Sequence, residues 1–211
     1  MPPDTMQAFY RAHDLSTWAE AIAGHPSPGP EDASDFEAAA VFPPVALQQA
    51  DSLALIEAMT RPHADLDAAH QYGGYWVRAI EDLAQCDILN RPEGPYTIWM
   101  KPGAFPTETT NLTCSRLVKD FSTRQWTGLT VHEFLVIQRL KALAHGDHRW
   151  SRYHGSETHP AGHQWLPNAR LGKKVFQGYW VAKSGQVQIG ACATGSKKAS
   201  RGAHPCLVTP L

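Results

Sequence analysis

The chain has 211 residues, of which 43% are hydrophobic, 18% charged and 9% aromatic. This composition is typical of a globular protein and excludes disordered, fibrous and membrane-embedded classes, because no apolar run approaches the ~20 residues that cross a bilayer. The first residues, MPPDTMQAFYRAHD, lack the basic and then apolar pattern of a secretory signal, so we expect a cytoplasmic protein with no membrane partner.

The net charge of −1 conceals a strong asymmetry along the chain. Residues 1–100 hold 4 Lys and Arg against 15 Asp and Glu, a net charge of −11. Residues 101–211 hold 15 Lys and Arg against 5 Asp and Glu, a net charge of +10, and seven of the eleven histidines. Such a division is typical of chains in which one half faces nucleic acid or another polyanion, although two opposite halves can also pack together and neutralise each other.

The first half of the chain reads as helical. Apolar spacing predicts a helix over residues 4–23, with Thr17 and Glu20 as a capping box within it. A proline-rich loop follows, and a second helix is expected over residues 45–60, ending before Pro62. Apolar residues at three- and four-residue intervals predict a third helix over residues 74–89.

The second half reads as mostly β, with strands predicted over residues 96–100 and 112–118. Its strongest local signal is the capping box of Thr130 and Glu133, which begins a helix that runs to Gly146 and is apolar on so wide an arc that it must be buried. Residues 174–182 and 186–193 read as two strands of a hairpin.

These elements predict an α+β fold, with a helical N-terminal half followed by a mostly antiparallel β-sheet packed on the buried capped helix. The charge and the elements together suggest an acidic helical region over residues 1–94 and a basic α+β region over residues 95–211. One continuous domain is the alternative organisation.

A histidine cluster follows the predicted capped helix, with five imidazoles within 19 residues: His145, His148, His154, His159 and His163. Imidazole is the commonest metal ligand, and a catalytic zinc requires three protein ligands and one open position. The spacing contains no HExxH motif, and an exposed polar loop is the simpler interpretation. The candidate ligands for Zn or Mn are His145, His148, His159 and His163, with Asp147 or Glu157 as a further ligand or general base.

Aromatic residues alternate with cations in the basic half. The aromatic residues are Trp126, Trp150, Tyr153, Trp165, Phe176, Tyr179 and Trp180, and the cations among them are Arg124, Arg149, Arg152, Arg170, Lys173 and Lys174. Single-stranded nucleic acids bind to such mixtures, although the rings can equally belong to the core. The candidate phosphate contacts are Arg149, Arg152, Lys173, Lys174, Lys197, Lys198 and Arg201, the last three on a glycine-rich loop.

We therefore predict a cytoplasmic binding protein whose basic C-terminal half engages nucleic acid or another polyanion, and whose acidic N-terminal half contacts a protein partner. One alternative is a metal-dependent hydrolase or nuclease that uses the histidine cluster. Another is an inhibitor or interaction protein whose acidic half mimics nucleic acid. The pattern does not decide between a binding protein and an enzyme.

Overall fold

The structure is a computed structural model that describes residues 2–25, 29, 35–66, 71, 75–77, 81–102, 107–148, 150, 152–153, 163–181, 183–196 and 201–211. Its helices are α1 (Pro3–Ala12), α2 (Ser16–Ala21), α3 (Val45–Ala50), α4 (Ser52–Thr60), α5 (Glu81–Ala84), the single 3-10 turn η1 (Thr107–Thr109), α6 (Cys114–Thr123) and α7 (Val131–His145). Its strands are β1 (Glu37–Phe42), β2 (Tyr75–Val77), β3 (Asp87–Ile88), β4 (Tyr96–Met100), β5 (Arg152–Tyr153), β6 (His163–Leu171), β7 (Lys174–Val181), β8 (Gln186–Ala193), β9 (Arg201–Gly202) and β10 (Cys206–Pro210).

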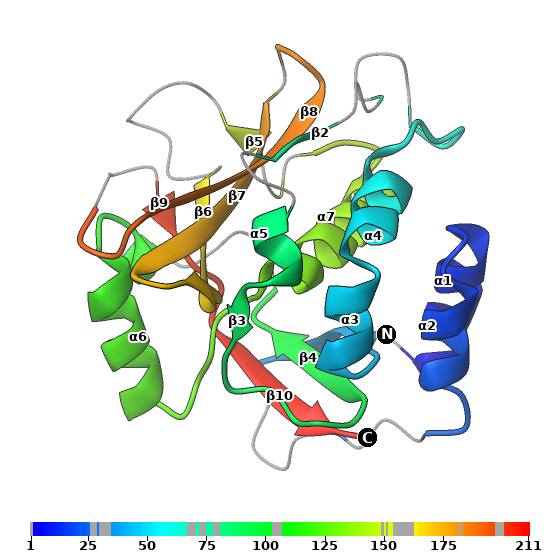
Figure 1. The fold of residues 1–211 in the computed structure, drawn as a ribbon, viewed down its shortest axis with the longest axis horizontal. Helices are drawn as coiled ribbons and strands as arrows, with labels where there is room; N and C mark the ends of the chain where they lie inside the picture. Colours follow the sequence, from blue (N-terminus) through cyan, green and yellow to red (C-terminus); the bar gives the residue numbers. More distant parts are fainter. Residues whose placement is uncertain are drawn as a thin grey trace.

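The described strands form two sheets. In the smaller sheet β4 lies between β1 and β10 and is antiparallel to both. The larger sheet has the order β2-β8-β7-β6-β3, and its long β6–β7 and β7–β8 ladders are antiparallel, while the short pairs β2–β8, β5–β7 and β9–β6 are parallel. Figure 1 shows the C-terminal strand β10 beside β4. The predicted α+β class with mostly antiparallel sheets is confirmed.

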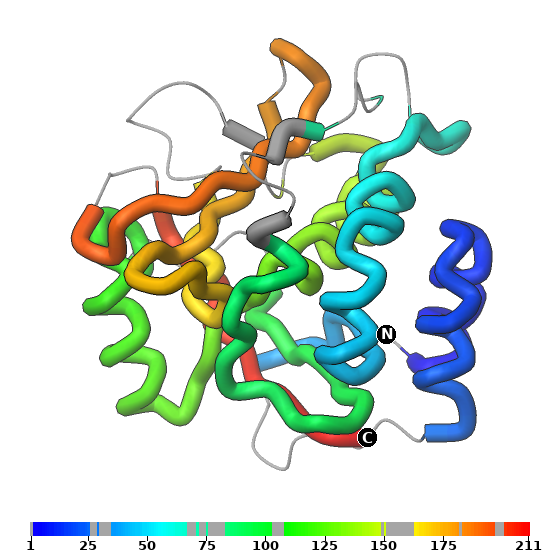
Figure 2. The backbone as a smooth tube through the Cα atoms, viewed as in Figure 1, coloured from blue at the N-terminus to red at the C-terminus, as the bar shows by residue number. Residues whose placement is uncertain are grey.

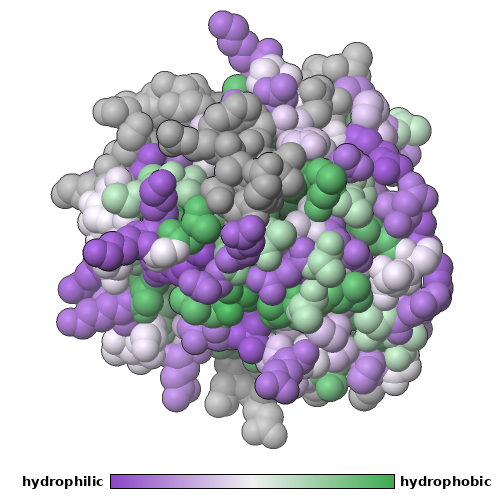
Figure 3. All heavy atoms as spheres, viewed as in Figure 1, coloured by the Kyte–Doolittle hydropathy of each residue, from purple (hydrophilic) through white to green (hydrophobic). Residues whose placement is uncertain are grey.

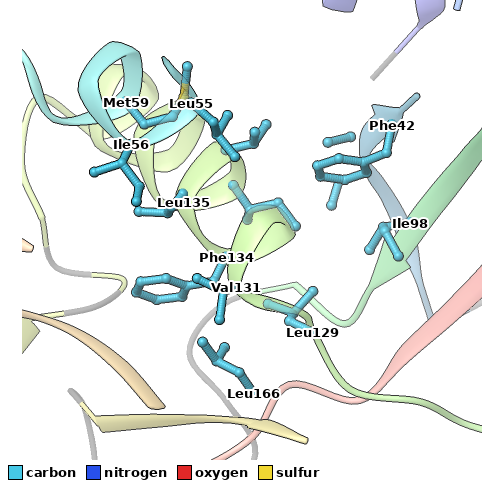
Figure 4. Packing of buried hydrophobic residues seen from close by; sticks show 14 of the residues in the cluster. Phe42, Leu55, Ile56, Met59, Ile98, Leu129, Val131, Phe134, Leu135 and Leu166 are labelled. Atoms are coloured by element: carbon cyan, nitrogen blue, oxygen red, sulfur yellow. The ribbon is translucent and has the colours of Figure 1, made fainter. Parts of the chain in front are cut away.

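Helix α7 confirms the predicted capped helix. The Thr130 hydroxyl accepts a hydrogen bond from the Glu133 amide, the Glu133 carboxylate accepts one from the Thr130 amide, and Gly146 ends the helix with a φ of 70°. Ten of its fifteen residues are buried, because it packs against α4, β1, β6 and β7. Figure 4 shows its apolar side chains between those of α4 and those of the sheets.

The helices of the first half are shorter than predicted. Residues 4–23 form α1 and α2, and the predicted capping box at Thr17 is wrong, because the Thr17 hydroxyl donates to Asp51 at 3.2 Å instead. Trp18 Nε1 donates to the same carboxylate at 2.9 Å. Asp51 also lies at the break that divides residues 45–60 into α3 and α4. The helix break therefore coincides with the place where α2 docks.

Two segments differ in secondary structure from the prediction. Residues 74–89, predicted as one helix, contain β2, the short α5 and β3, since β2 pairs with β8 and β3 pairs with β6. Residues 112–118, predicted as a strand, lead into α6, where the Thr113 hydroxyl caps the helix by accepting a hydrogen bond from the Arg116 amide at 3.2 Å. The predicted strand over residues 96–100 and the β7–β8 hairpin are confirmed.

The buried apolar residues form two clusters. The larger cluster surrounds α7 and draws residues from both sides of the boundary suggested at residue 95, for example Trp18 and Leu55 with Phe134 and Trp180. The smaller cluster lies under α6, which packs against β6. It contains Cys114, Leu117, Phe121, Trp165, Val175 and Ala203, with Leu112, Trp126 and Cys192 against it.

Helices α1 and α2 lie at one edge of the molecule and α6 lies at the opposite edge (Figures 1 and 2). The N-terminal helices α1 and α2 therefore do not cover α6. Within the described ranges, none of the helices has the length and hydropathy needed to cross a bilayer.

Candidate functional site

Three segments that are distant in the sequence meet at one end of the smaller sheet. A row of paired residues crosses the sheet through Thr127, Cys206, Met100 and Glu37. Trp126 precedes this row on one segment, Lys101 follows it on the second, and Phe36 precedes it on the third. The pairing of Glu37 with Met100 places Phe36 beside Lys101, and the side chains of both residues contact the indole of Trp126.

We refer to Phe36, Lys101, Phe121, Arg124 and Trp126 as the Trp126 cluster. Lys101 Nζ lies 4.8 Å from the centre of the Trp126 ring and 5.8 Å from that of Phe36. Arg124 Cζ lies 4.9 Å from the centre of the Trp126 ring. Phe36 and Phe121 pack edge-on against the indole, with ring centroids 5.9 and 6.3 Å away. These cation–π contacts hold two positive charges beside one half-buried ring.

The two cations of the cluster have no described carboxylate as an ion-pair partner. Glu37, which pairs across the sheet with the residue before Lys101, binds Lys141 at 3.1 Å, and Asp120, four residues before Arg124, pairs with Arg116 at 3.0 Å. Arg124 is exposed and Lys101 is partly exposed. Neither charge is therefore neutralised by a carboxylate of the described residues. Figure 3 shows hydrophilic side chains at the edge of the molecule where α6 lies.

A pocket of about 440 Å³ opens beside the cluster, between α6, the loop after it, β6 and β10. Its described lining residues are Asn90, Val118, Phe121, Ser122, Gln125, Trp126, Thr127, Gly128, Pro167, Asn168 and Val208. They combine apolar surface with amide and hydroxyl groups, and no charged residue stands among them. This size and lining are typical of a small-ligand pocket.

The turn after α6 places Trp126 at the pocket. Arg124 ends the helix, Gln125 adopts a left-handed conformation with a φ of 56°, and the Trp126 amide then donates to the Phe121 carbonyl at 2.8 Å. Asn90, which also lines the pocket, has a φ of 55°. Residues other than glycine adopt such a φ at an energetic cost, and they concentrate at functional sites.

The buried side-chain amide of Asn168 fixes one wall of the pocket. Asn168 Oδ1 accepts a hydrogen bond from the Gly128 amide, and Asn168 Nδ2 donates to the Leu89 carbonyl, both at 2.9 Å. Gly128 lies so close to Pro167 that a Cβ at position 128 would lie 2.1 Å from Pro167 Cγ. Only glycine allows this approach, so the wall has one well-defined position.

Arg91 ties the same loop to the start of α7. Its guanidinium donates to both carboxylate oxygens of Glu133, at 2.5 and 2.7 Å, to the Gly128 carbonyl at 2.6 Å and to the Thr127 hydroxyl at 3.2 Å. Both charged side chains are almost fully buried. Burial by itself lowers the pKa of Arg91, but the Glu133 carboxylate outweighs that effect and raises it above its ordinary value. Arg91 therefore keeps its positive charge in the folded protein.

The candidate phosphate contacts named from the sequence do not all reach the surface. Lys173 and Lys174 are exposed at the β6–β7 turn. Arg201, placed on a loop by the sequence, lies in β9 at 7% exposure, with its guanidinium 4.9 Å from the centre of the Trp165 ring. The placement of Arg201 on an exposed loop is thus wrong. Arg149, Lys197, Lys198 and the side chain of Arg152 lie outside the described residues.

The candidate metal ligands occupy separate places. His145 is exposed at the end of α7. The buried His148 stacks on Trp180, with centroids 3.6 Å apart, and the buried His163 lies edge-on to Tyr179 at 4.0 Å. His159 lies outside the described residues.

The sheet separates the two buried histidines of this set. Tyr179 and Trp180 are consecutive residues of β7, so their side chains point to opposite faces of the sheet. His163 contacts Tyr179 and His148 contacts Trp180, so the two histidines lie on opposite faces as well. In the part of the chain that the structure describes, no three His, Cys, Asp or Glu side chains are grouped to hold a metal. The Zn or Mn site stays a prediction, since His159 and Glu157 lie beyond that part.

Sequence reasoning found part of this site and missed the rest. Trp126 and Arg124 belong to the mixture of rings and cations that the sequence shows. Lys101 and Phe36 were missed, because the register that pairs Glu37 with Met100 sets them side by side, and only the folded chain brings the indole to them. The signal that points to them is their position next to two strands, one of which the sequence did not predict.

Comparison of the chain with protein-family models, curated protein sequences and solved structures found no match.

Proposed function

We propose that the chain is a nucleic-acid-binding protein, in which the Trp126 cluster and the exposed side of α6 bind a single strand. The observation that carries the proposal is the pair of cations, Lys101 and Arg124, held beside one aromatic ring without a described carboxylate partner. Proteins that bind single strands combine cations that meet phosphates with aromatic rings that meet bases. Both kinds of group are present here within one cluster.

The ion pairs of the described residues support a basic half that is open to a partner. Lys141 pairs with Glu37, which neutralises one cation of the basic half with a carboxylate of the acidic half. A second pair between the halves joins Arg91 of the acidic half to Glu133 of the basic half. This pair neutralises one of the five carboxylates of the basic half. Exposed cations on and near α6, such as Lys119, extend the positive surface.

The acidic N-terminal half has a different role in this proposal. Helices α1 and α2 lie at the edge opposite α6, which leaves them free to contact a protein partner while a strand is bound (Figure 1). Charges separated by much more than the Debye length of about 8 Å at physiological salt influence each other little. Reversing Asp4 and Glu20, both exposed, therefore leaves the affinity for nucleic acid unchanged. The proposed location is the cytoplasm.

The proposal is tested by fluorescence anisotropy of labelled single-stranded DNA, single-stranded RNA and duplex DNA, titrated with the protein at about 50 and 200 mM salt, where phosphate contacts weaken steeply. We expect single strands to bind more tightly than the duplex, with an affinity that falls as salt rises. Lys101→Met and Arg124→Met each reduce the slope of log K against log salt by about 0.7, the value for one phosphate contact with a single strand.

The matched control is Lys183→Met, which removes an exposed cation from the β7–β8 turn, away from α6 in Figure 1. We expect this variant to keep the slope of the wild type. The absence of any salt-dependent association would contradict the proposal. An equal loss of slope in all three variants would show that binding is not centred on the Trp126 cluster.

A further inference from the structure

The pocket and the cations beside it divide the chemistry of the site into two zones. The described lining of the pocket carries amide, hydroxyl and apolar groups without a charge. The charges stand outside it, where Lys101 and Arg124 flank Trp126, which itself lines the pocket. A ligand that matches both zones has an uncharged part with hydrogen-bonding edges and, next to it, an anionic part.

We infer that the pocket takes one unstacked nucleobase of the bound strand, while Lys101 and Arg124 hold the phosphate beside that base. The inference rests on the proposed function and names the unit of nucleic acid that the site recognises. A nucleotide has this division, since its base is neutral and flat and its phosphate is anionic. Other polyanions, such as sulfated polysaccharides, offer the charge without the base.

The walls of the pocket suit the two faces of a base. Val118 and Phe121 come from α6, Pro167 comes from β6, and Val208 comes from β10, so apolar surface reaches the pocket from more than one side. Trp126 contributes the largest ring. Flat aromatic ligands gain from burial against apolar and aromatic surface regardless of which base is present.

The edges of a base require hydrogen bonds, and the pocket offers groups that can supply them. The side chains of Asn90, Ser122 and Gln125 line the pocket and have no hydrogen-bond partner among the described residues. An amide can donate and accept at once, as the edge of a base requires. Asn168 is already bonded to Gly128 and Leu89, so it shapes the pocket instead of reading the ligand.

The wall of the pocket at Gly128 is held in one position by its neighbours. Gly128 is held by Asn168 and Arg91 and lies against Pro167. A site whose wall is fixed in advance loses little conformational freedom on binding. The rigid wall therefore favours a ligand of defined shape over loose electrostatic adhesion.

The first experiment compares two labelled strands of equal length and charge, one of deoxythymidine nucleotides and one with the same backbone but no bases. We expect the strand with bases to bind the wild-type protein about 5- to 150-fold more tightly, the range that one stacked base contributes. Equal affinity for both strands, with a steep salt dependence, would overturn the base pocket and leave the proposed function standing. Failure of both strands to bind would overturn the proposed function as well.

A second experiment fills the pocket. Ser122 is exposed on α6 and lines the pocket, so Ser122→Trp places an indole where the base would lie. Thr123 is also exposed on α6 but is not part of the lining, so Thr123→Trp is the matched control. We expect the first variant to bind both strands equally and the second to keep the preference for bases. A preserved preference in the first variant would overturn the inference.

A third measurement separates strands from free nucleotides, which carry the same chemistry. Calorimetric titration with each nucleoside monophosphate is expected to give weak binding, because one phosphate replaces the several of a strand. Binding of a monophosphate as tight as that of the strand would support the nucleotide pocket and overturn the binding of strands as the function.

Discussion

The buried pair of Arg91 and Glu133 offers a sharp test of how the site is held in place. Substitution of Glu133 by glutamine keeps the shape of the side chain and removes the charge that faces the guanidinium. The carboxylate accepts four hydrogen bonds, two from Arg91, one from the Tyr96 hydroxyl and one from the Thr130 amide. Loss of one partner from a buried ion pair destabilises a protein by about 3–5 kcal/mol, a large part of the roughly 5–15 kcal/mol that holds a domain folded.

For a chain of this size, a destabilisation of about 3–5 kcal/mol lowers the Tm by roughly 6–20 °C. Differential scanning calorimetry and urea unfolding of Glu133→Gln measure this change. The matched control is Asp120→Asn, which breaks the exposed pair with Arg116 and is expected to change the free energy of unfolding by no more than about 0.5 kcal/mol. Equal, small effects of both substitutions would refute the view that the Arg91 and Glu133 pair holds the loop after α6.

The remaining predictions concern two glycines and the buried histidines. Gly128→Ala is expected to destabilise the protein by about 1–3 kcal/mol and to weaken nucleic-acid binding. In Gly178→Ala the new Cβ would lie 2.5 Å from the Phe134 ring, so we expect a similar destabilisation but an unchanged affinity of the folded protein. Anisotropy and urea unfolding check both, and unchanged affinity in the first would contradict the role of the wall. Burial lowers the pKa of His132 from 6.5 to about 4 and that of His204 from 6.5 to about 3. Below pH ~6.5 the unfolded chain therefore binds more protons than the folded protein, and stability falls as the pH drops toward 4. The loss is about 2 kcal/mol per histidine at pH ~5. Urea midpoints at several pH values should fall less steeply for His132→Gln, and equal slopes would contradict this reasoning.

Elements whose stabilising contacts are local were predicted correctly. The capping box of Thr130 and Glu133 and the glycine at position 146 all lie within α7 or next to it, so the sequence contains the whole signal. The β7–β8 hairpin is likewise closed by a short turn between strands that pair with each other.

Elements defined by distant partners were predicted wrongly. Residues 74–89 have helical spacing, but pairing with β8 and β6 makes part of this segment strand. Residues 112–118 resemble a strand, yet the Thr113 cap and the contact of α6 with β6 make the segment helical. Local propensity gives way here to partners that lie far along the chain.

The candidate site follows the same division. Trp126 stands out in the sequence as a ring among cations, but nothing near it in the sequence points to Lys101, which only the folded chain brings to the ring. Arg201 illustrates the opposite error. Its neighbours in the sequence are small and basic residues typical of an exposed loop, whereas the fold places its guanidinium over Trp165.

The most direct test of the central claim locates the bound strand on the protein. A single-stranded oligonucleotide that carries a photoreactive uracil is cross-linked to the protein, and the attached peptides are mapped by mass spectrometry after trypsin digestion. We expect the attachment within residues 120–139, at Phe121 or Trp126, with loss of the product when an unlabelled strand competes. Attachment confined to other aromatic residues, such as Tyr75 or Tyr179, or a product that no competitor removes, would contradict the account.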